Sequence, residues 1–185
     1  IDLTAWVIYY HRLKLEYLKF IISIYICHMT IKLIAIGKTD SKALLQLIAE
    51  YQKRLKHYVK FELEIIPDIK NTKNLSEAQQ KEKEGELILK NLSNTDVLVL
   101  LDENGKQFSS IDFSGYLQKK MNAGLKQLVF VIGGPYGFST DVYNKAQGKI
   151  SLSKMTFSHQ MVRLFVVEQV YRAFTILRNE PYHHQ

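Results

Sequence analysis

The chain has 185 residues, of which 46% are hydrophobic and 23% charged, as is usual for one globular domain. Its formal net charge of +7 favours a polyanionic partner, RNA or DNA first, because basic side chains that neutralise phosphates release counterions. Its one cysteine, Cys27, excludes a disulfide framework and a cysteine-rich zinc site, and is compatible with a reducing cytoplasm.

The first 28 residues differ from the rest of the chain. Residues 1–28 are rich in Ile, Tyr, Leu and Lys and lack a clear amphipathic period. Their longest apolar run is too short to span a bilayer, which takes about 20 residues, and no small-residue cleavage site follows, as a signal peptide would require. We expect residues 1–28 to be an upstream or non-native extension and residues 29–185 to form the domain. The alternative is a membrane-binding N-terminal helix.

From residue 30 onward, apolar runs alternate with stretches of helical spacing. The pattern predicts strands at residues 30–36, 60–66, 97–101, 128–132 and 150–152 and helices at residues 41–57, 76–92, 110–121, 140–146 and 158–178. This order predicts an α/β domain with a mostly parallel sheet and helices on both faces. Because ligands bind beyond the carboxyl ends of such strands, the turns after Leu101, Ile132 and Leu152 are the candidate sites.

Three strand-end segments carry the candidate ligand-binding residues. The turn at residues 133–137 has three glycines that let backbone approach a ligand, but it matches no phosphate-binding fingerprint and could be structural. In the expected turn at residues 102–105, Asp102 could bind a ribose, a base or a metal, or simply be hydrophilic. The backbone of residues 152–157 could hold an adenine edge while apolar side chains pack on the ring, or the segment could be a plain connector.

The last predicted helix is apolar on more than one side, so we expect a second subunit to cover it. Within it, Glu168 and Arg172 are spaced to pair with each other, whereas a free Arg172 could meet a phosphate. The tail after this helix offers an aromatic ring and titratable donors at Tyr182 and His183, unless it is a frayed end. No set of His, Asp and Glu has a convincing metal-ligand spacing, and no serine nucleophile elbow is present.

Taken together, these segments resemble the RlmH family of ribosomal RNA pseudouridine N3-methyltransferases, within the SPOUT superfamily. The resemblance runs in order from Met29 to the end, and residues 1–28 have no counterpart in it. The segments that carry it are Ile36-Gly37-Lys38, Tyr51 with Lys53-Arg54, Leu101-Asp102 with Gly105-Lys106, Gly133-Gly134 with Gly137, Leu152-Ser153-Lys154-Met155-Thr156-Phe157, His159-Gln160-Met161 with Arg163, Glu168 to Ala173 and Pro181-Tyr182-His183-His184.

The resemblance implies a fold, a cofactor and a substrate. The sheet would carry a C-terminal trefoil knot, and the protein would be a cytoplasmic homodimer. S-adenosyl-L-methionine (SAM) would be the methyl donor, held by the knot loops. Carried over by position, the cofactor contacts would be Leu101, Gly133, Leu152, Ser153, Lys154, Met155, Thr156 and Phe157. The implied substrate is a pseudouridine in helix 69 of large-subunit ribosomal RNA within the assembled ribosome, with no metal and no membrane involved.

For the substrate side of this implied reaction, we predict Arg172, Tyr182 and His183. His183 is a candidate base for the N3 proton, and Arg172 could stabilise the developing anion or hold a phosphate. Alternative interpretations are a SPOUT enzyme that acts on another RNA such as tRNA, and a ribosome-assembly factor without catalysis. A nicotinamide-dependent enzyme is disfavoured because the dinucleotide fingerprint is missing.

Overall fold

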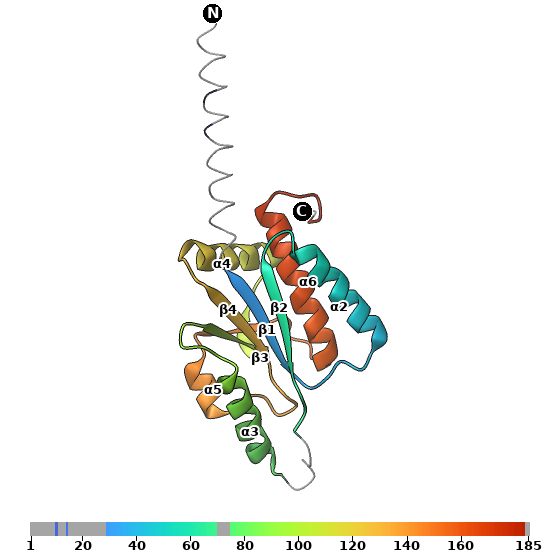
Figure 1. Cartoon of the computed structure of the whole chain (residues 1–185), viewed down its shortest axis with the longest axis vertical. Coiled ribbons are helices and arrows are strands. Elements are labelled where there is room, and N and C mark those ends of the chain that lie inside the picture. Colours follow the sequence, from blue (N-terminus) through green and yellow to red (C-terminus); the bar gives the residue numbers. More distant parts are fainter. Residues whose placement is uncertain (1–9, 11–13, 15–28, 70–74, 184–185) are drawn as a thin grey trace, which may run out of the picture.

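A five-stranded sheet forms the centre of the computed structural model, which describes residues 10, 14, 29–69 and 75–183 (Figure 1). Its strands are β1 (Thr30–Ile36), β2 (Lys60–Ile66), β3 (Val97–Gln107), β4 (Gln127–Ile132) and β5 (Gly148–Ser151). The helices are α2 (Lys42–Leu55), α3 (Glu77–Lys90), α4 (Ser110–Asn122), α5 (Thr140–Lys145) and α6 (His159–Leu177). The strand order is β2-β1-β4-β3-β5 and every pairing is parallel, so the predicted α/β class is confirmed.

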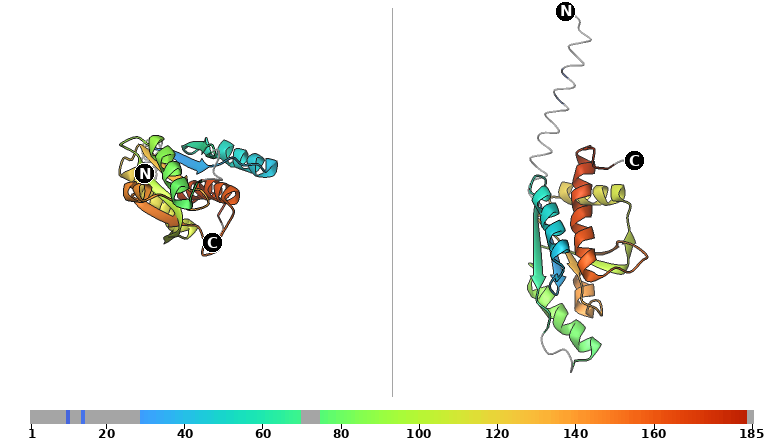
Figure 2. Two further views of the ribbon diagram at one scale, coloured as in Figure 1. Left: turned by 90° about the horizontal axis from the view of Figure 1, so that it is seen from below. Right: turned by 90° about the vertical axis from the view of Figure 1, so that its right-hand side faces the viewer.

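The sheet buries both of its faces, as the apolar strands predicted. Strand side chains alternate between faces, so Leu33 of β1 belongs to the core shared with α2, α4 and α6, while its neighbour Ile34 belongs to the core shared with α3 and α5. On the first face, α6 packs between α2 and α4, and it runs beside α2 in both Figures 1 and 2. This long helix also contacts β4, the middle strand of the sheet.

A serine begins each helix of the described part. Ser41, Ser76, Ser109, Ser139 and Ser158 are the N-cap residues, and each hydroxyl accepts a hydrogen bond from a backbone N–H in the first helical turn. This bond satisfies a donor that the helix itself leaves unpaired. The helix starts predicted from the sequence are thereby explained to within one or two residues.

Strand β3 corrects one prediction, because residues 102–105 are not a simple turn that ends the strand. The strand continues to Gln107, and both Leu101 and Lys106 lie opposite Ile150 of β5, so the residues between them bulge out of the ladder. Gly105 makes this return possible. A Cβ at Gly105 would lie 2.5–2.7 Å from backbone atoms of Ile150, which no other residue type could accept.

The described helices have no membrane-spanning character: none of them is long and apolar enough to cross a bilayer. The alternatives for residues 1–28, an extension or a membrane-binding helix, lie outside the described residues except at positions 10 and 14.

Candidate active site

A cavity of about 390 Å³ lies between the bulge of β3, which follows Leu101, and the segment that follows the carboxyl end of β5. Two of the three predicted sites, the turns after Leu101 and Leu152, meet at this cavity. All of the predicted cofactor residues line it except Gly133. The lining residues are Leu101, Asp102, Glu103, Asn104, Ile150, Ser151, Leu152, Ser153, Lys154, Met155, Thr156, Phe157 and Val162. The bulge of β3 therefore forms one wall, and the loop of residues 152–157, which we call the cofactor loop, forms the other.

The cofactor loop is shaped by its own serines and by α6. Ser151 Oγ donates to the carbonyl oxygen of Ser153 at 2.9 Å, and Ser153 Oγ accepts from the Met155 N–H at 2.9 Å. Phe157 packs edge-on against Phe165 of α6, with ring centroids 5.0 Å apart. Met155 is 73% exposed and Leu152 37% exposed, so the loop presents apolar side chains beside the cavity on which a flat ring could pack.

The carboxylate of Asp102 has a fixed place in the wall of this cavity. It accepts hydrogen bonds from the Tyr143 hydroxyl at 2.6 Å and from the Asn104 N–H at 2.8 Å. Burial, together with the Asp102 and Glu103 carboxylates, raises the pKa of Tyr143 to about 12, so this phenol remains a donor at neutral pH. Sequence reasoning missed Tyr143, because nothing in the local pattern of α5 indicates a contact with β3.

A narrow apolar cleft of about 80 Å³ adjoins the cavity and shares Leu101, Ile150, Ser151 and Leu152 with it. Rings from the start of α4 and the segment before it, Phe108 and Phe113, form one side, and Val166 and Gln169 of α6 close the other. Sequence reasoning did not find these aromatic residues either. The cleft brings the cofactor loop close to the middle of α6, where the predicted substrate residues begin.

The turn at residues 133–137, which includes Gly133, requires glycine for structural reasons. A Cβ at Gly133 would lie 3.0 Å from the Phe138 ring, and one at Gly134 would lie 2.2 Å from the carboxylate of Glu84. Gly137 has a positive φ of 83° and donates its N–H to the Gly134 carbonyl at 3.2 Å. Its assignment as a cofactor contact stays a prediction, because Gly133 is not among the residues that line the cavity.

The tail turns back onto α6 at a left-handed residue. Asn179 has a φ of 54° and donates to the Ile176 carbonyl at 3.0 Å, and the next N–H, of Glu180, reaches the Thr175 carbonyl at 2.9 Å. This pair of bonds is a Schellman motif, which ends a helix and reverses the chain. Tyr182 is thereby placed against α6, so the part of the tail through Tyr182 is not a frayed end.

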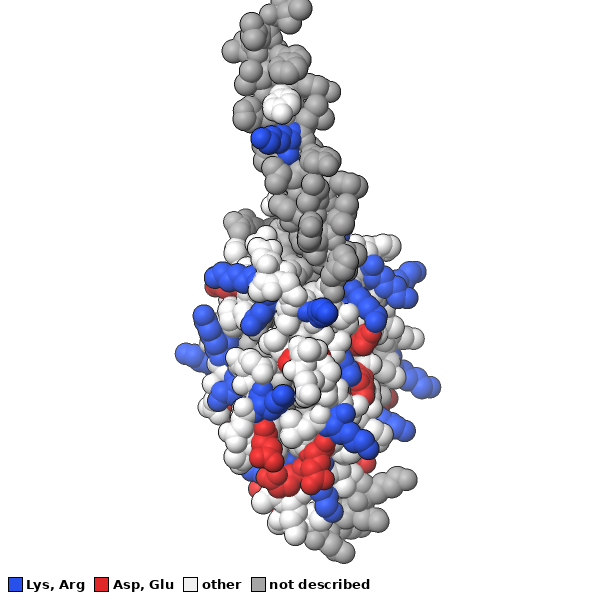
Figure 3. All heavy atoms as spheres, turned by 60° about the vertical axis from the view of Figure 1, so that its left-hand side comes forward, with Lys and Arg blue, Asp and Glu red and all other residues white. Residues whose placement is uncertain are grey.

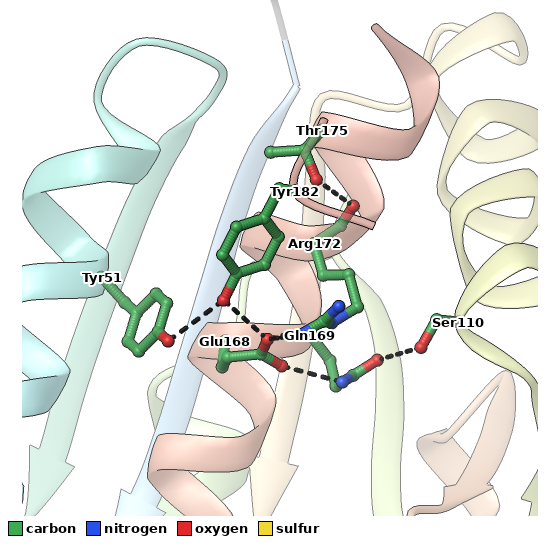
Figure 4. Close-up of polar contacts among 7 residues, drawn as sticks. All are labelled: Tyr51, Ser110, Glu168, Gln169, Arg172, Thr175 and Tyr182. Carbon is green, nitrogen blue, oxygen red and sulfur yellow. Dashed lines mark hydrogen bonds and ion pairs between the residues drawn. The ribbon is translucent and has the colours of Figure 1, made fainter. Parts of the chain in front are cut away.

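Glu168 is the centre of the polar contacts at this end of α6 (Figure 4). Its Oε1 accepts from Arg172 Nε at 2.9 Å and from the Tyr182 hydroxyl at 3.0 Å, while its Oε2 accepts from Gln169 Nε2 at 2.8 Å. The Tyr51 hydroxyl of α2 lies 3.1 Å from that of Tyr182. Glu168 thus holds two of the three predicted substrate residues together.

The three predicted substrate residues differ in the contacts that hold their side chains. Arg172 pairs with Glu168, as the spacing allowed, and its guanidinium lies 4.6 Å from the centroid of the Tyr182 ring. Burial, the Tyr51 hydrogen bond and the Glu168 carboxylate raise the pKa of Tyr182, so its hydroxyl is a donor and not a base at neutral pH. His183 is half-buried and has no hydrogen-bond partner among the described residues, and His184 lies outside them.

The described residues offer no site for a metal ion, since no group of three or more His, Cys, Asp or Glu side chains could hold one. What the geometry does offer is an open cavity with apolar and carboxylate walls, next to an apolar cleft that reaches Gln169 of α6, which donates to Glu168. That arrangement suits the binding of a small organic cofactor next to a polar, anionic substrate.

The chain is similar to known proteins over nearly all of its described length. A family model described as "Predicted SPOUT methyltransferase" matches residues 29–183. A protein of Flavobacterium johnsoniae named ribosomal RNA large subunit methyltransferase H is 76% identical over 157 residues, which are 85% of this chain and 100% of the relative. Proteins of the same name from Flavobacterium psychrophilum and Christiangramia forsetii are 74% and 72% identical with the same coverage.

A solved structure of a methylase family protein from Neisseria gonorrhoeae matches 87% of this chain and 87% of its own, with a TM-score of 0.45 at 15% identity. The chain belongs to the SPOUT methyltransferase family, whose members take the methyl group that they transfer from SAM.

Proposed function

We propose that this chain is a SAM-dependent methyltransferase that methylates N3 of a pseudouridine in helix 69 of large-subunit ribosomal RNA. It acts on the assembled ribosome in the cytoplasm, and residues 29–185 are its catalytic unit. The observation that carries the proposal is the cavity between the β3 bulge and the cofactor loop, in a chain 76% identical to a protein named for methylation of this RNA.

The cavity fits SAM in size and in chemistry. Its volume of about 390 Å³ lies in the range of roughly 300–1,000 Å³ that is usual for small-molecule sites. Leu152 and Met155 offer apolar surface to the adenine, and the carboxylates of Asp102 and Glu103 suit ribose hydroxyls and the positive charges of the cofactor. When bound, SAM supplies an electrophilic methyl group on a sulfonium.

The residues on α6 and the tail serve the nucleotide. N3 of pseudouridine is a weakly acidic imide nitrogen that must lose its proton as it takes up the methyl group. We assign the imidazole of His183 as the acceptor of this proton, because its ring nitrogen can act as a general base and the tail carries it next to Tyr182. The N–H groups of Arg172 that do not bind Glu168 stabilise the negative charge that develops on the base. Tyr182, whose hydroxyl donates to Glu168, holds the guanidinium in place with its ring. Positioning of the two reactants supplies up to roughly 7–11 kcal/mol of the barrier reduction.

The basic surface supports an RNA substrate. Figure 3 shows Lys and Arg side chains spread over much of one face, while Asp and Glu gather toward its lower end. The net charge of +7 acts in the same direction, because phosphate neutralisation releases counterions.

The enzyme works as a homodimer with a C-terminal trefoil knot, as the family resemblance implies. The cover of α6 comes largely from α2, α4 and the tail of the same chain. Met161, Leu164 and Phe165 of α6 nevertheless keep part of their surface. These apolar side chains support a subunit interface along the open side of α6.

Transfer of tritiated methyl groups from SAM to ribosomes, free ribosomal RNA and tRNA tests the proposed function. We expect labelled ribosomes, with the modification mapped to a pseudouridine of helix 69. Labelling of tRNA alone would instead identify an enzyme for another RNA. A folded protein that shows no SAM binding by calorimetry would indicate an assembly factor without catalysis.

Replacement of the substrate-side residues tests their roles. We expect Arg172→Ala and His183→Ala each to lower the transfer rate by about 10²–10⁴-fold, the usual contribution of a positioned proton acceptor or charge stabiliser. His159→Ala, an exposed histidine at the start of α6, serves as the control and should leave the rate unchanged. Unchanged rates at every pH for the two variants would refute both assignments.

A further inference from the structure

A second cavity, of about 360 Å³, lies between α2 and α6 and is separate from the cofactor cavity. We call it the α2–α6 pocket. It is lined by Glu50, Lys53, Arg54, His57, Tyr58 and Tyr171. It includes the Lys53-Arg54 pair of α2, to which the proposed reaction gives no role.

Positive charge exceeds negative charge around the α2–α6 pocket. Arg54 pairs with the exposed Glu50, but no carboxylate of the described residues lies within ion-pair distance of Lys53, whose side chain is exposed. Arg178 adds a further cation at the end of α6, where its guanidinium donates to the His57 carbonyl at 3.0 Å. Besides Glu50, the carboxylate of Glu180 lies at this pocket, where it accepts from the Tyr58 hydroxyl. The three cations outnumber these two carboxylates, so an anion that enters the pocket meets a net positive charge.

Aromatic rings alternate with these cations. The guanidinium of Arg54 lies 5.3 Å from the ring centroid of Tyr51 and 5.7 Å from that of Tyr171, and the guanidinium of Arg178 lies 4.4 Å from that of Tyr58. The Tyr58 and Tyr171 rings meet edge to face at 5.6 Å. Cations that lie over aromatic rings in an open groove are the combination with which proteins hold unstacked nucleotides, since phosphates pair with the cations and bases stack on the rings.

The α2–α6 pocket is continuous with the proposed substrate residues. The Tyr171 ring contacts the Tyr182 ring with centroids 4.8 Å apart, and the Tyr51 hydroxyl lies 3.1 Å from the Tyr182 hydroxyl. Figure 4 shows Tyr51 and Tyr182 facing each other between α2 and α6. RNA held in the pocket would therefore reach the tail without crossing a separate element.

We propose that the α2–α6 pocket is an auxiliary RNA site that holds a nucleotide flanking the target, with its phosphate at Lys53 and Arg54 and its base against Tyr58 or Tyr171. The substrate assignment rests on the proposed function, but the binding of single-stranded RNA does not. The excess of cations over carboxylates favours RNA over a protein partner or a second copy of this chain, whose interface cores are depleted of charge.

The test compares Lys53→Ala/Arg54→Ala with the wild-type protein, using 70S ribosomes that lack the modification as substrate. We expect KM for ribosomes to rise about tenfold or more, while kcat stays within about twofold and SAM affinity by calorimetry is unchanged. In filter binding to ribosomes and to poly(U), the slope of log K against log salt should become less negative by about 1–2, because each removed cation leaves one phosphate with its counterions.

The control is Lys83→Ala/Lys90→Ala, which removes two exposed lysines from α3 on the other face of the sheet and should change neither KM nor the salt slope. Unchanged affinity and slope in the α2 variant would overturn the proposal. Dissociation of a dimer by this variant in sedimentation would also overturn it and assign the pocket to a second copy. If the wild type methylates no RNA yet binds poly(U) through Lys53 and Arg54, the pocket stands and the proposed function fails.

Discussion

The two ends of α6 serve their ligands in different ways. At its amino end, the cofactor cavity is shaped by backbone: the β3 bulge, the close approach of Gly105 to Ile150 and a loop bonded to itself through Ser153. From its middle toward its carboxyl end, side chains form the site, and one carboxylate, that of Glu168, accepts from Arg172, Tyr182 and Gln169. Changes in backbone shape should therefore harm the first end most, and changes in side-chain chemistry the second.

The largest effect is expected for Gly105→Val. The new Cβ would meet Ile150 backbone 2.5–2.7 Å away, and backbone cannot move aside as a flexible side chain can. We expect a loss of about 3 kcal/mol in the free energy of unfolding in urea and no measurable SAM binding by calorimetry. Gly115→Ala is the matched control: nothing lies within 4 Å of its Cβ, so the helix should gain about 0.5–1 kcal/mol. Normal SAM affinity in Gly105→Val would contradict the backbone account of this end.

Glu168→Gln tests the side-chain contacts that the Glu168 carboxylate makes on α6. The Glu168 side chain is 16% exposed and that of Arg172 26%, so the pair is partly shielded from water. We expect methyl transfer to fall about 10–100-fold and stability by about 1–2 kcal/mol, less than the 3–5 kcal/mol typical of a broken, fully buried pair. SAM affinity should not change. Glu62→Gln, in an exposed pair with Lys60, should cost under about 0.5 kcal/mol. Equal losses in the two variants would show that Glu168 has no special role.

Asn179→Val tests how the tail reaches the side-chain end. A β-branched residue at a φ of 54° costs roughly 1–2 kcal/mol, whereas Asn179→Gly should be nearly neutral. We expect the valine variant to release Tyr182 from Glu168 and to lose methyl transfer, with SAM binding intact. Protease sensitivity of the last residues, compared between the valine and glycine variants, measures the release. An equally protected tail in both would mean that the Schellman motif is not what holds it.

The sequence predicted features that depend on local pattern and missed those that depend on distant contacts. Apolar runs located the five strands and helical spacing located the five helices, because both signals lie within a few residues. The extension of β3 depends on Gly105 meeting Ile150, 45 positions later, so a polar Asp-Glu-Asn-Gly stretch was interpreted as a turn. The Asp102–Tyr143 bond and the return of Tyr182 to Glu168 also join residues that no local period connects.

The smallest effect is expected for Tyr143→Phe, which changes side-chain chemistry at the cofactor cavity. The raised pKa of Tyr143, about 12, means that the native state favours the neutral phenol. Its contribution to stability is therefore complete below the unfolded pKa of about 10 and is lost as pH rises from 10 to about 12. At pH 8 the variant should lose under about 1 kcal/mol in the free energy of unfolding, since Tyr143 is 39% exposed, and the difference from wild type should shrink above pH 10.

Tyr116→Phe is the control, because burial alone raises the pKa of Tyr116 to about 12 and no hydrogen bond is removed. No loss in the free energy of unfolding is therefore expected at pH 8. Tyr143→Phe could instead lower SAM affinity by a larger factor than Glu168→Gln lowers the rate of methyl transfer. That result would contradict the comparison between the two sites, because a side chain and not backbone shape would then decide cofactor binding.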